Sequence, residues 1–127
     1  VNTLFVKEVF FMNATIMAPN AEYQACLDAC HKCAQICQEC FRLCLEEQDV
    51  KSREHCILDL MDCADACSMA GCAISRRSKH LKQICEMCAN ICDECAKECS
   101  KFTDDHNRMC ADACRKCADE CRKMVSM

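Results

Sequence analysis

The sequence predicts an all-α protein, an antiparallel up-down-up-down four-helix bundle with a core lined by cysteine. Three observations support this prediction. The 19 cysteines of the 127-residue chain follow one another mostly in steps of three and four, which return each side chain to one face of a helix. A single glycine and a single proline are too few for a turn-rich β fold or a loop-rich disulfide scaffold. The links expected between the helices are short and polar, and short links join antiparallel neighbours.

The first predicted helix covers residues 20–47. Asn20 is a suitable N-cap, Glu22 places a carboxylate in the first turn, and Pro19 sets the upstream limit. Six cysteines form the inward face of this helix: Cys26, Cys30, Cys33, Cys37, Cys40 and Cys44.

The second predicted helix covers residues 52–75 and has the fewest cysteines on its inward face. Leu60 and Ile74 take two of the positions that a cysteine would otherwise occupy. Cys72 follows Cys67 by five residues, next to Gly71, and is therefore out of step with the others. The cysteines of this helix are Cys56, Cys63, Cys67 and Cys72.

The third and fourth predicted helices cover residues 78–102 and residues 104 or 105 to 124, and both repeat the spacing of the first. In the fourth helix, Asn107 stands where the same face would carry another cysteine. The cysteines of these two helices are Cys85, Cys88, Cys92, Cys95 and Cys99, then Cys110, Cys114, Cys117 and Cys121.

The two ends of the predicted bundle differ in chemistry. In an antiparallel bundle, one end collects apolar side chains that would close the core: Tyr23, Ile74, Leu81 and Met124. The opposite end, which we call the polar end, collects polar, aromatic and soft side chains: Glu47, Arg53, His55, Phe102, His106, Asn107 and Met109. This difference predicts an apolar plug at one end and an entrance for ions at the other.

Residues 1–19 differ from the rest of the chain and are predicted to form a short apolar extension, followed by the cysteine-rich bundle in residues 20–127. The extension has no basic segment at its start, and Lys7 and Glu8 interrupt its apolar run, so it does not match a secretory signal. It is too short to span a membrane. A short amphipathic helix that packs on the bundle or on a neighbouring subunit is the favoured interpretation.

Composition and charge exclude several classes of protein. The net charge is −4, and the 16 basic and 20 acidic residues are interspersed, so neither nucleic acid nor a membrane is an expected partner. The sequence has no phosphate-binding loop or Ser-His-Asp constellation, and no enzyme is predicted. A mainly disulfide-bonded state is disfavoured by the odd cysteine count and the helical spacing. Reduced thiols without an export signal predict a cytoplasmic protein.

A row of thiolates inside a helical bundle needs protons or metal ions to neutralise its charge. Two cysteines four residues apart can turn toward one ion, which favours Cu(I). Zinc prefers four tetrahedral ligands, commonly on loops, and the spacing lacks the motifs typical of iron–sulfur proteins. Cysteine as mere core filler would not require so many oxidisable groups in register. The C-x-x-x-C pairs are Cys26/Cys30, Cys33/Cys37, Cys40/Cys44, Cys63/Cys67, Cys88/Cys92, Cys95/Cys99, Cys110/Cys114 and Cys117/Cys121.

In these motifs the chain resembles the bacterial four-helix-bundle copper storage proteins, in particular those of the cytosolic type. The resemblance covers about residues 21–124. The segments that carry it are CLDACHKCAQICQECFRLC at residues 26–44, CADAC at 63–67, CEMCANICDECAKEC at 85–99 and CADACRKCADEC at 110–121. It implies storage or detoxification of copper, with multiple Cu(I) ions per chain held by core thiolates, and assembly into a homotetramer.

The candidate metal ligands are the cysteines and three residues of the polar end. The two histidines of the polar end are placed to relay Cu(I) to the first thiolates, and its methionine offers a soft thioether. A copper chaperone with a shallow site and a thiolate zinc-binding protein remain as alternatives, and a thiol–disulfide redox enzyme is less favoured. The full set is Cys26, Cys30, Cys33, Cys37, Cys40, Cys44, Cys56, Cys63, Cys67, Cys72, Cys85, Cys88, Cys92, Cys95, Cys99, Cys110, Cys114, Cys117, Cys121, His55, His106 and Met109.

Apolar residues at outward positions of the helices cannot all face the cysteine-lined core. Some of them are therefore expected to be buried in a subunit interface. These residues are Ile36, Ile57, Leu58, Met61, Ile84, Met87 and Ile91.

Overall fold

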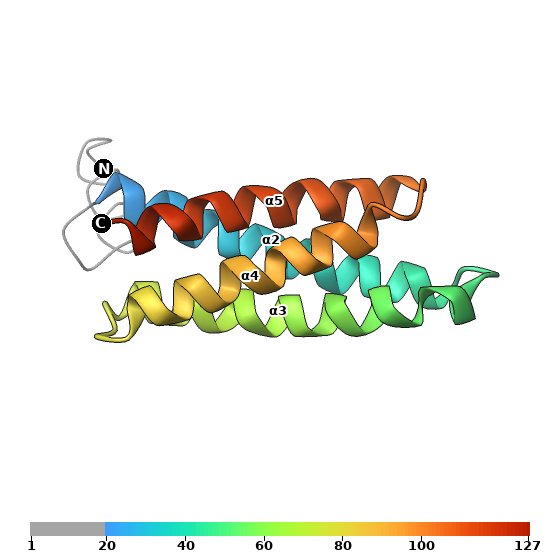
Figure 1. The fold of residues 1–127 in the computed structure, drawn as a ribbon, viewed down its shortest axis with the longest axis horizontal. Helices are drawn as coiled ribbons and strands as arrows, with labels where there is room; N and C mark the ends of the chain where they lie inside the picture. The colour runs from blue at the N-terminus through green and yellow to red at the C-terminus, as the bar shows by residue number, and fades with distance from the viewer. Residues whose placement is uncertain (1–19) are drawn as a thin grey trace, which may run out of the picture.

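The structure, a computed structural model, describes residues 20–127, which form four long helices (Figure 1). The elements are α2 (Ala21–Leu45), the 3-10 helix η1 (Val50–Arg53), α3 (Glu54–Ser75), α4 (Leu81–Cys99) and α5 (Asp105–Val125). The all-α prediction is confirmed. The predicted apolar extension, residues 1–19, lies outside the described residues, so its helix and its boundary with the bundle stay predictions.

Consecutive helices run in opposite directions along the bundle (Figure 1). The Sγ atom of Cys26, early in α2, lies 3.8 Å from that of Cys121, late in α5. Further along α2, the Sγ atom of Cys37 lies 3.7 Å from that of Cys110, early in α5. Rising residue numbers in α2 therefore meet falling numbers in α5. The α2–α3 and α4–α5 links lie together at the polar end, and the α3–α4 link lies at the opposite end.

The start of α2 is fixed by the predicted N-cap. The backbone of Asn20 is extended, and its side-chain oxygen accepts hydrogen bonds from the N–H groups of Glu22 at 3.0 Å and Tyr23 at 3.2 Å. These bonds satisfy two of the backbone donors that the first turn of a helix leaves without partners. The cap therefore fixes the residue at which α2 begins.

Several predicted helix boundaries differ from the structure. Helix α2 ends at Leu45 and not at residue 47, and α4 ends at Cys99 and not at residue 102. The starts of α3 and α4 differ for local reasons. The segment before α3 forms the tighter η1 turn, in which the Ser52 hydroxyl donates to the carbonyl of Asp49 at 2.7 Å, so α3 begins two residues later than predicted. At its other end, α3 is closed by Arg77, whose φ of 53° lies in the left-handed region, and by the N–H of Ser78, which donates to the carbonyl of Ala73. The next residues form a turn, and α4 begins at Leu81.

The core of the bundle consists of cysteine and alanine, with few large side chains. Ile74 and Met124 are buried at the end opposite the polar end, while Tyr23 and Leu81 are partly buried beside them, as the predicted apolar plug requires. The guanidinium of Arg77 covers the Tyr23 ring at 4.1 Å from its centroid. Within residues 20–127, no helix is long and apolar enough to cross a membrane.

Candidate metal centre

Eighteen of the 19 cysteines are buried free thiols that follow one another along the axis of the bundle; we call this set the thiol column. Each of the 18 is at most 1% exposed. Sulfur atoms from facing helices approach to 3.7–3.9 Å, as between Cys33 and Cys114 at 3.7 Å and between Cys37 and Cys114 at 3.9 Å. The helical spacing of the sequence therefore becomes a continuous row of sulfur.

The thiol column contains several groups of sulfurs that can share one metal ion. Within each group all the sulfurs lie within 4.8 Å of one another, and neighbouring groups have cysteines in common. Groups that share members allow one thiolate to bridge two ions. The groups include Cys30/Cys88/Cys117/Cys121, Cys33/Cys67/Cys92/Cys117, Cys33/Cys37/Cys63/Cys114, Cys37/Cys95/Cys110/Cys114 and Cys26/Cys85/Cys121.

Burial and hydrogen bonding pull the pKa values of the thiols in opposite directions. Hydrogen bonding with Cys44, followed by burial, raises the pKa of Cys56 to about 12. Hydrogen bonds with Cys40 and Cys56 lower the pKa of Cys44, and Arg53 lowers it further. Neighbouring thiols thus compete for protons, because a buried thiolate is stable only where donors or a cation surround it. A soft cation that replaces these protons relieves the competition.

At the polar end, Arg53 lies across the end of the thiol column. Although charged, it is only 6% exposed. Its Nε atom donates to Asp49 Oδ1 at 2.6 Å, and its two Nη atoms hold both carboxylate oxygens of Asp104 at 3.0 and 2.9 Å. Its guanidinium lies 4.4 Å from the centroid of the Phe102 ring. The hydrogen bond from Arg53 lowers the pKa of Asp104, so the pair is charged at neutral pH.

Asn107 connects this arginine to the thiols, and it is fully buried. Its Oδ1 accepts hydrogen bonds from Arg53 Nη1 at 3.0 Å and from the Cys44 thiol at 3.5 Å, while its Nδ2 donates to Cys56 Sγ at 3.4 Å. The asparagine therefore ends the row of cysteines on α5 with a group that can satisfy both a donor and an acceptor.

His106 lies beside the thiol column, near the polar end. Its Nε2 is 3.0 Å from Glu47 Oε1 and 3.5 Å from Asp104 Oδ2, and its Nδ1 is 3.5 Å from Cys40 Sγ. Because ionised carboxylates only accept hydrogen bonds, Nε2 is the ring nitrogen that donates to them, and Nδ1 is the ring nitrogen that faces Cys40. An imidazole nitrogen and a thiol thus converge at a place where the histidine side chain is still 16% exposed.

The structure places the other three candidate ligands on the surface. Cys72 is exposed, because five residues beyond Cys67 its side chain has turned away from the inward face of α3. Met109 is 58% exposed, since it is one step of the helix away from the inward Cys110. His55 is exposed in the first turn of α3. A ligand role for these three residues stays a prediction.

Asp49 and Asp104 also lie at the polar end, where they hold Arg53, and neither was predicted there from the sequence. Both lie at the loops that join the helices, and the helical spacing carries no information about loops. The presence of Arg53 at an inward position was the available clue, because a buried guanidinium requires carboxylate partners.

An all-helical bundle whose interior is a continuous row of free thiols defines a class of protein, the metal-binding helical bundles with thiol-lined cores. Within this class, the family profile described as copper storage protein matches residues 19–126. The chain belongs to this family. No curated protein sequence matches the chain.

Solved structures of bacterial copper storage proteins have the same fold. A Cu(I)-bound copper storage protein, BsCsp3, is 41% identical, with 82% of this chain and 98% of that chain covered and a TM-score of 0.79. The apo form of copper storage protein 3 from Bacillus subtilis is 43% identical, with 80% and 97% covered and a TM-score of 0.77. The copper storage protein of Streptomyces lividans, loaded with 10 copper equivalents, is 32% identical, with 83% and 84% covered and a TM-score of 0.80.

Proposed function

We propose that this protein stores Cu(I) in its thiol column and has no catalytic role. The observation that carries the proposal is the burial of 18 free thiols in one continuous row, with facing sulfurs at 3.7–3.9 Å. Thiolate is a soft ligand that suits Cu(I), and two cysteines four residues apart can supply the two thiolates that such an ion accepts. A chaperone that hands over single ions would need an exposed site, and a thiol–disulfide enzyme an exposed reactive pair. Deep burial of the thiols favours storage over both.

The number of thiols sets the expected capacity. Eighteen thiolates that act in pairs hold about nine Cu(I) ions, and bridging by shared thiolates raises this number. The related structures described as Cu(I)-bound and as loaded with 10 copper equivalents are consistent with a capacity of this size. Anaerobic titration of the reduced protein with Cu(I) against a strong chelator tests the proposal. A capacity of one or two ions per chain would contradict storage.

We propose that Cu(I) enters the thiol column beside His106. The Nδ1 lone pair and the Cys40 thiol offer a first pair of soft ligands, and Glu47 attracts cations to the entrance. Replacement of His106 by alanine should slow loading and leave the capacity unchanged. His55→Ala tests whether the exposed histidine contributes as well, and His31→Ala, at an exposed position on α2, is the matched control. Unchanged loading kinetics in His106→Ala would remove this residue from the pathway.

Zinc is a second candidate ion, because the thiol column contains groups of four thiols. A tetrahedral zinc site with Zn–S bonds of about 2.3 Å has sulfurs about 3.8 Å apart, and facing sulfurs in the thiol column lie at 3.7–3.9 Å. Cu(I) added to the zinc-saturated protein separates the candidates. Copper storage predicts release of all bound zinc, measured with a colorimetric zinc indicator. Retention of the zinc would favour a zinc-binding protein.

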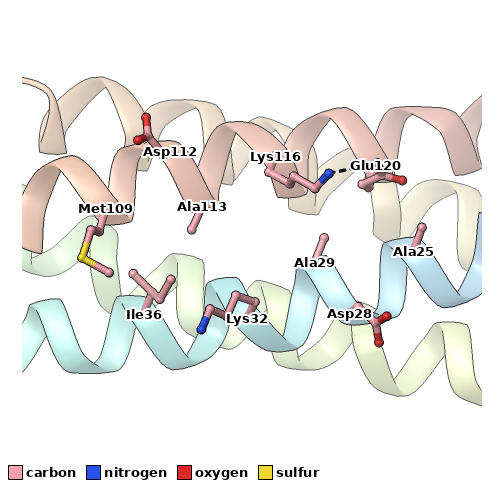
Figure 2. A pocket seen from close by; sticks show the side chains of 10 residues that line it. All are labelled: Ala25, Asp28, Ala29, Lys32, Ile36, Met109, Asp112, Ala113, Lys116 and Glu120. Atoms are coloured by element: carbon pink, nitrogen blue, oxygen red, sulfur yellow. Dashed lines mark ion pairs between the residues drawn. The ribbon is translucent and has the colours of Figure 1, made fainter.

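We propose that the protein is a homotetramer, and that two apolar surfaces form its interfaces. The first is a groove of about 630 Å³ between α2 and α5 (Figure 2). Ile36 and Met109 stand at one end of the groove, small side chains such as Ala29 and Ala113 leave its centre open, and acidic and basic residues alternate along its edges. The second is a stripe along α3, in which Leu58, Met61 and Met69 are 54%, 46% and 49% exposed.

A tetramer with dihedral symmetry requires two different two-fold interfaces, and these two surfaces could supply them. We expect Ala29→Glu in the groove and Met61→Glu in the stripe each to yield dimers, and the double variant to yield monomers. Light scattering coupled to size-exclusion chromatography measures these masses. A wild-type monomer would contradict the proposal, and Lys97→Glu, at an exposed position of α4, is the control.

We propose a cytoplasmic location. The thiol column functions only while its cysteines are reduced, and the cytoplasm keeps thiols reduced. A relative from Streptomyces lividans, 32% identical with a TM-score of 0.81, is described as a cytosolic copper storage protein.

A further inference from the structure

The two routes from solvent to the thiol column at the polar end differ in their chemistry. Along the bundle axis, the first side chain is Arg53, which is held by both oxygens of Asp104, by Asp49 and by Asn107. The fourth contact, from Arg53 Nη1 to Cys44 Sγ at 3.8 Å, places the guanidinium directly over the last thiol of α2. An ion on this route would have to displace the whole guanidinium.

Arginine cannot pass a metal ion along this route. A guanidinium carries only N–H donors and no lone pair, and it does not lose its proton in proteins. Asn107, immediately behind it, already uses Oδ1 to accept from Arg53 and Cys44 and Nδ2 to donate to Cys56. Between the guanidinium and the thiols, the axial route therefore passes Asn107, whose side-chain oxygen and nitrogen are both already engaged in hydrogen bonds.

The route beside α5 offers ligands at each step. Exposure falls from the Glu47 side chain at 38% to His106 at 16% and then to Cys40 at 1%. Each of these residues presents a lone pair to the next position. Asp104 also belongs to both routes, because it holds Arg53 with both oxygens and lies 3.5 Å from His106 Nε2.

We propose that Arg53 is a positioning residue that closes the axial end of the thiol column and so restricts Cu(I) exchange to the route past His106. The Phe102 ring over the guanidinium and the ion pairs with Asp49 and Asp104 keep the guanidinium in place. This inference rests on the proposed storage of Cu(I). It assigns to the buried arginine a second function besides its contribution to stability. The arginine determines by which route Cu(I) enters and leaves the thiol column.

The test is a double-mutant cycle on the rate of loading, followed by stopped-flow absorbance with Cu(I) supplied as its glutathione complex. In the wild-type background, His106→Ala should slow loading about fivefold, a size typical of coupled neighbours. In an Arg53→Met background the axial route is open, and the same histidine substitution should slow loading less than about twofold. A merely structural arginine would not change the effect of the histidine.

Two further variants keep the test decisive. Arg42→Met removes an arginine near the same end of the bundle that is 76% exposed in its side chain, and the effect of His106→Ala should persist in that background. Removal of Arg53 leaves the Asp104 carboxylate without its ion-pair partner, which can prevent folding. If Arg53→Met does not fold, Arg53→Met/Asp104→Asn also removes this carboxylate and replaces Arg53→Met in the test. Equal slowing in the wild-type and Arg53→Met backgrounds, or no slowing in the wild type, would overturn the inference. Failure of the wild-type protein to take up Cu(I) would instead overturn the proposed function.

Discussion

Substitution of one thiol in the middle of the column should reduce the copper capacity, whereas substitution of the exposed thiol should not. Cys114 is the most informative position, because its sulfur lies 3.7 Å from those of Cys33 and Cys63 and 3.9 Å from that of Cys37. It belongs to two of the four-thiol groups. Cys72, which is exposed on α3, is the matched control.

The magnitude follows from these contacts. With thiolates acting in pairs or bridging two ions, the loss of one sulfur shared by two groups should remove about one to two Cu(I) ions per chain. Cys114→Ala also leaves a cavity the size of a sulfur atom, which costs about 1 kcal/mol of stability. A domain with a free energy of unfolding of about 5 to 15 kcal/mol tolerates this loss. The change in capacity therefore reports on ligation and not on unfolding.

The assay is anaerobic titration of the reduced proteins with Cu(I), with the free ion monitored by a chromogenic chelator. The wild-type protein and Cys72→Ala should reach the same end point, and Cys114→Ala an earlier one. Circular dichroism of the three apo proteins checks that each remains helical. Identical end points for all three proteins, or an equal loss in Cys72→Ala, would refute the assignment of the ions to the thiol column.

Four further predictions concern stability and pH. Asn20→Ala should lower the free energy of unfolding by about 1 kcal/mol, since it removes two hydrogen bonds at the start of α2. Urea unfolding measures this change, and an unchanged midpoint would contradict the prediction. Ile74→Ala, at a side chain with 0% exposure, should cost about 2 to 5 kcal/mol in the same assay, and a loss as small as that of a surface substitution would argue against the apolar plug. Because Arg53 lowers the pKa of Asp104 below its ordinary 3.8, their pairing stabilises the fold above pH 3.8 and is lost as the pH falls through the lowered value. Asp104→Asn should therefore make thermal stability less dependent on pH in acid, and an unaltered pH profile would refute this assignment. Cu(I) must replace thiol protons, so loading in weakly buffered solution should release protons and the apparent affinity should rise with pH; a pH-independent affinity would contradict thiolate binding.

The helices and the inward faces were predictable from the sequence because they depend on local periodicity. Steps of three and four between cysteines fix which side of each helix is buried, whatever the neighbouring helix is. The N-cap at Asn20 was predictable for the same reason, since its partners lie two and three residues away. The start of α4 was not predictable in this way. The left-handed conformation of Arg77 lets the chain continue as a turn after α3, so α4 begins at Leu81 and not at residue 78.

The polar end was predictable only in outline. Arg53 and Asn107 were identified from the inward positions of their helices, and His106 from its place next to Asn107 in the sequence. The structure brings Arg53 and Asn107 together and places His106 beside Asp104. Met109 and His55 are close in sequence to the inward residues Cys110 and Cys56, but they lie on the outer faces of their helices. Their exposure follows from the helical periodicity only when the exact rotation of each helix is known. The partners of the arginine, Asp49 and Asp104, come from loops and required three-dimensional information.

Anomalous diffraction at the copper edge from crystals of the Cu(I)-loaded protein tests the central claim most directly. It locates each ion and the sulfurs around it in one measurement. Storage in the thiol column predicts a row of copper sites along the bundle axis, from the group of Cys26, Cys85 and Cys121 at one end to the thiols of Cys44 and Cys56 at the other. One or two sites in total, or copper bound mainly at exposed residues such as Cys72 and His55, would contradict it.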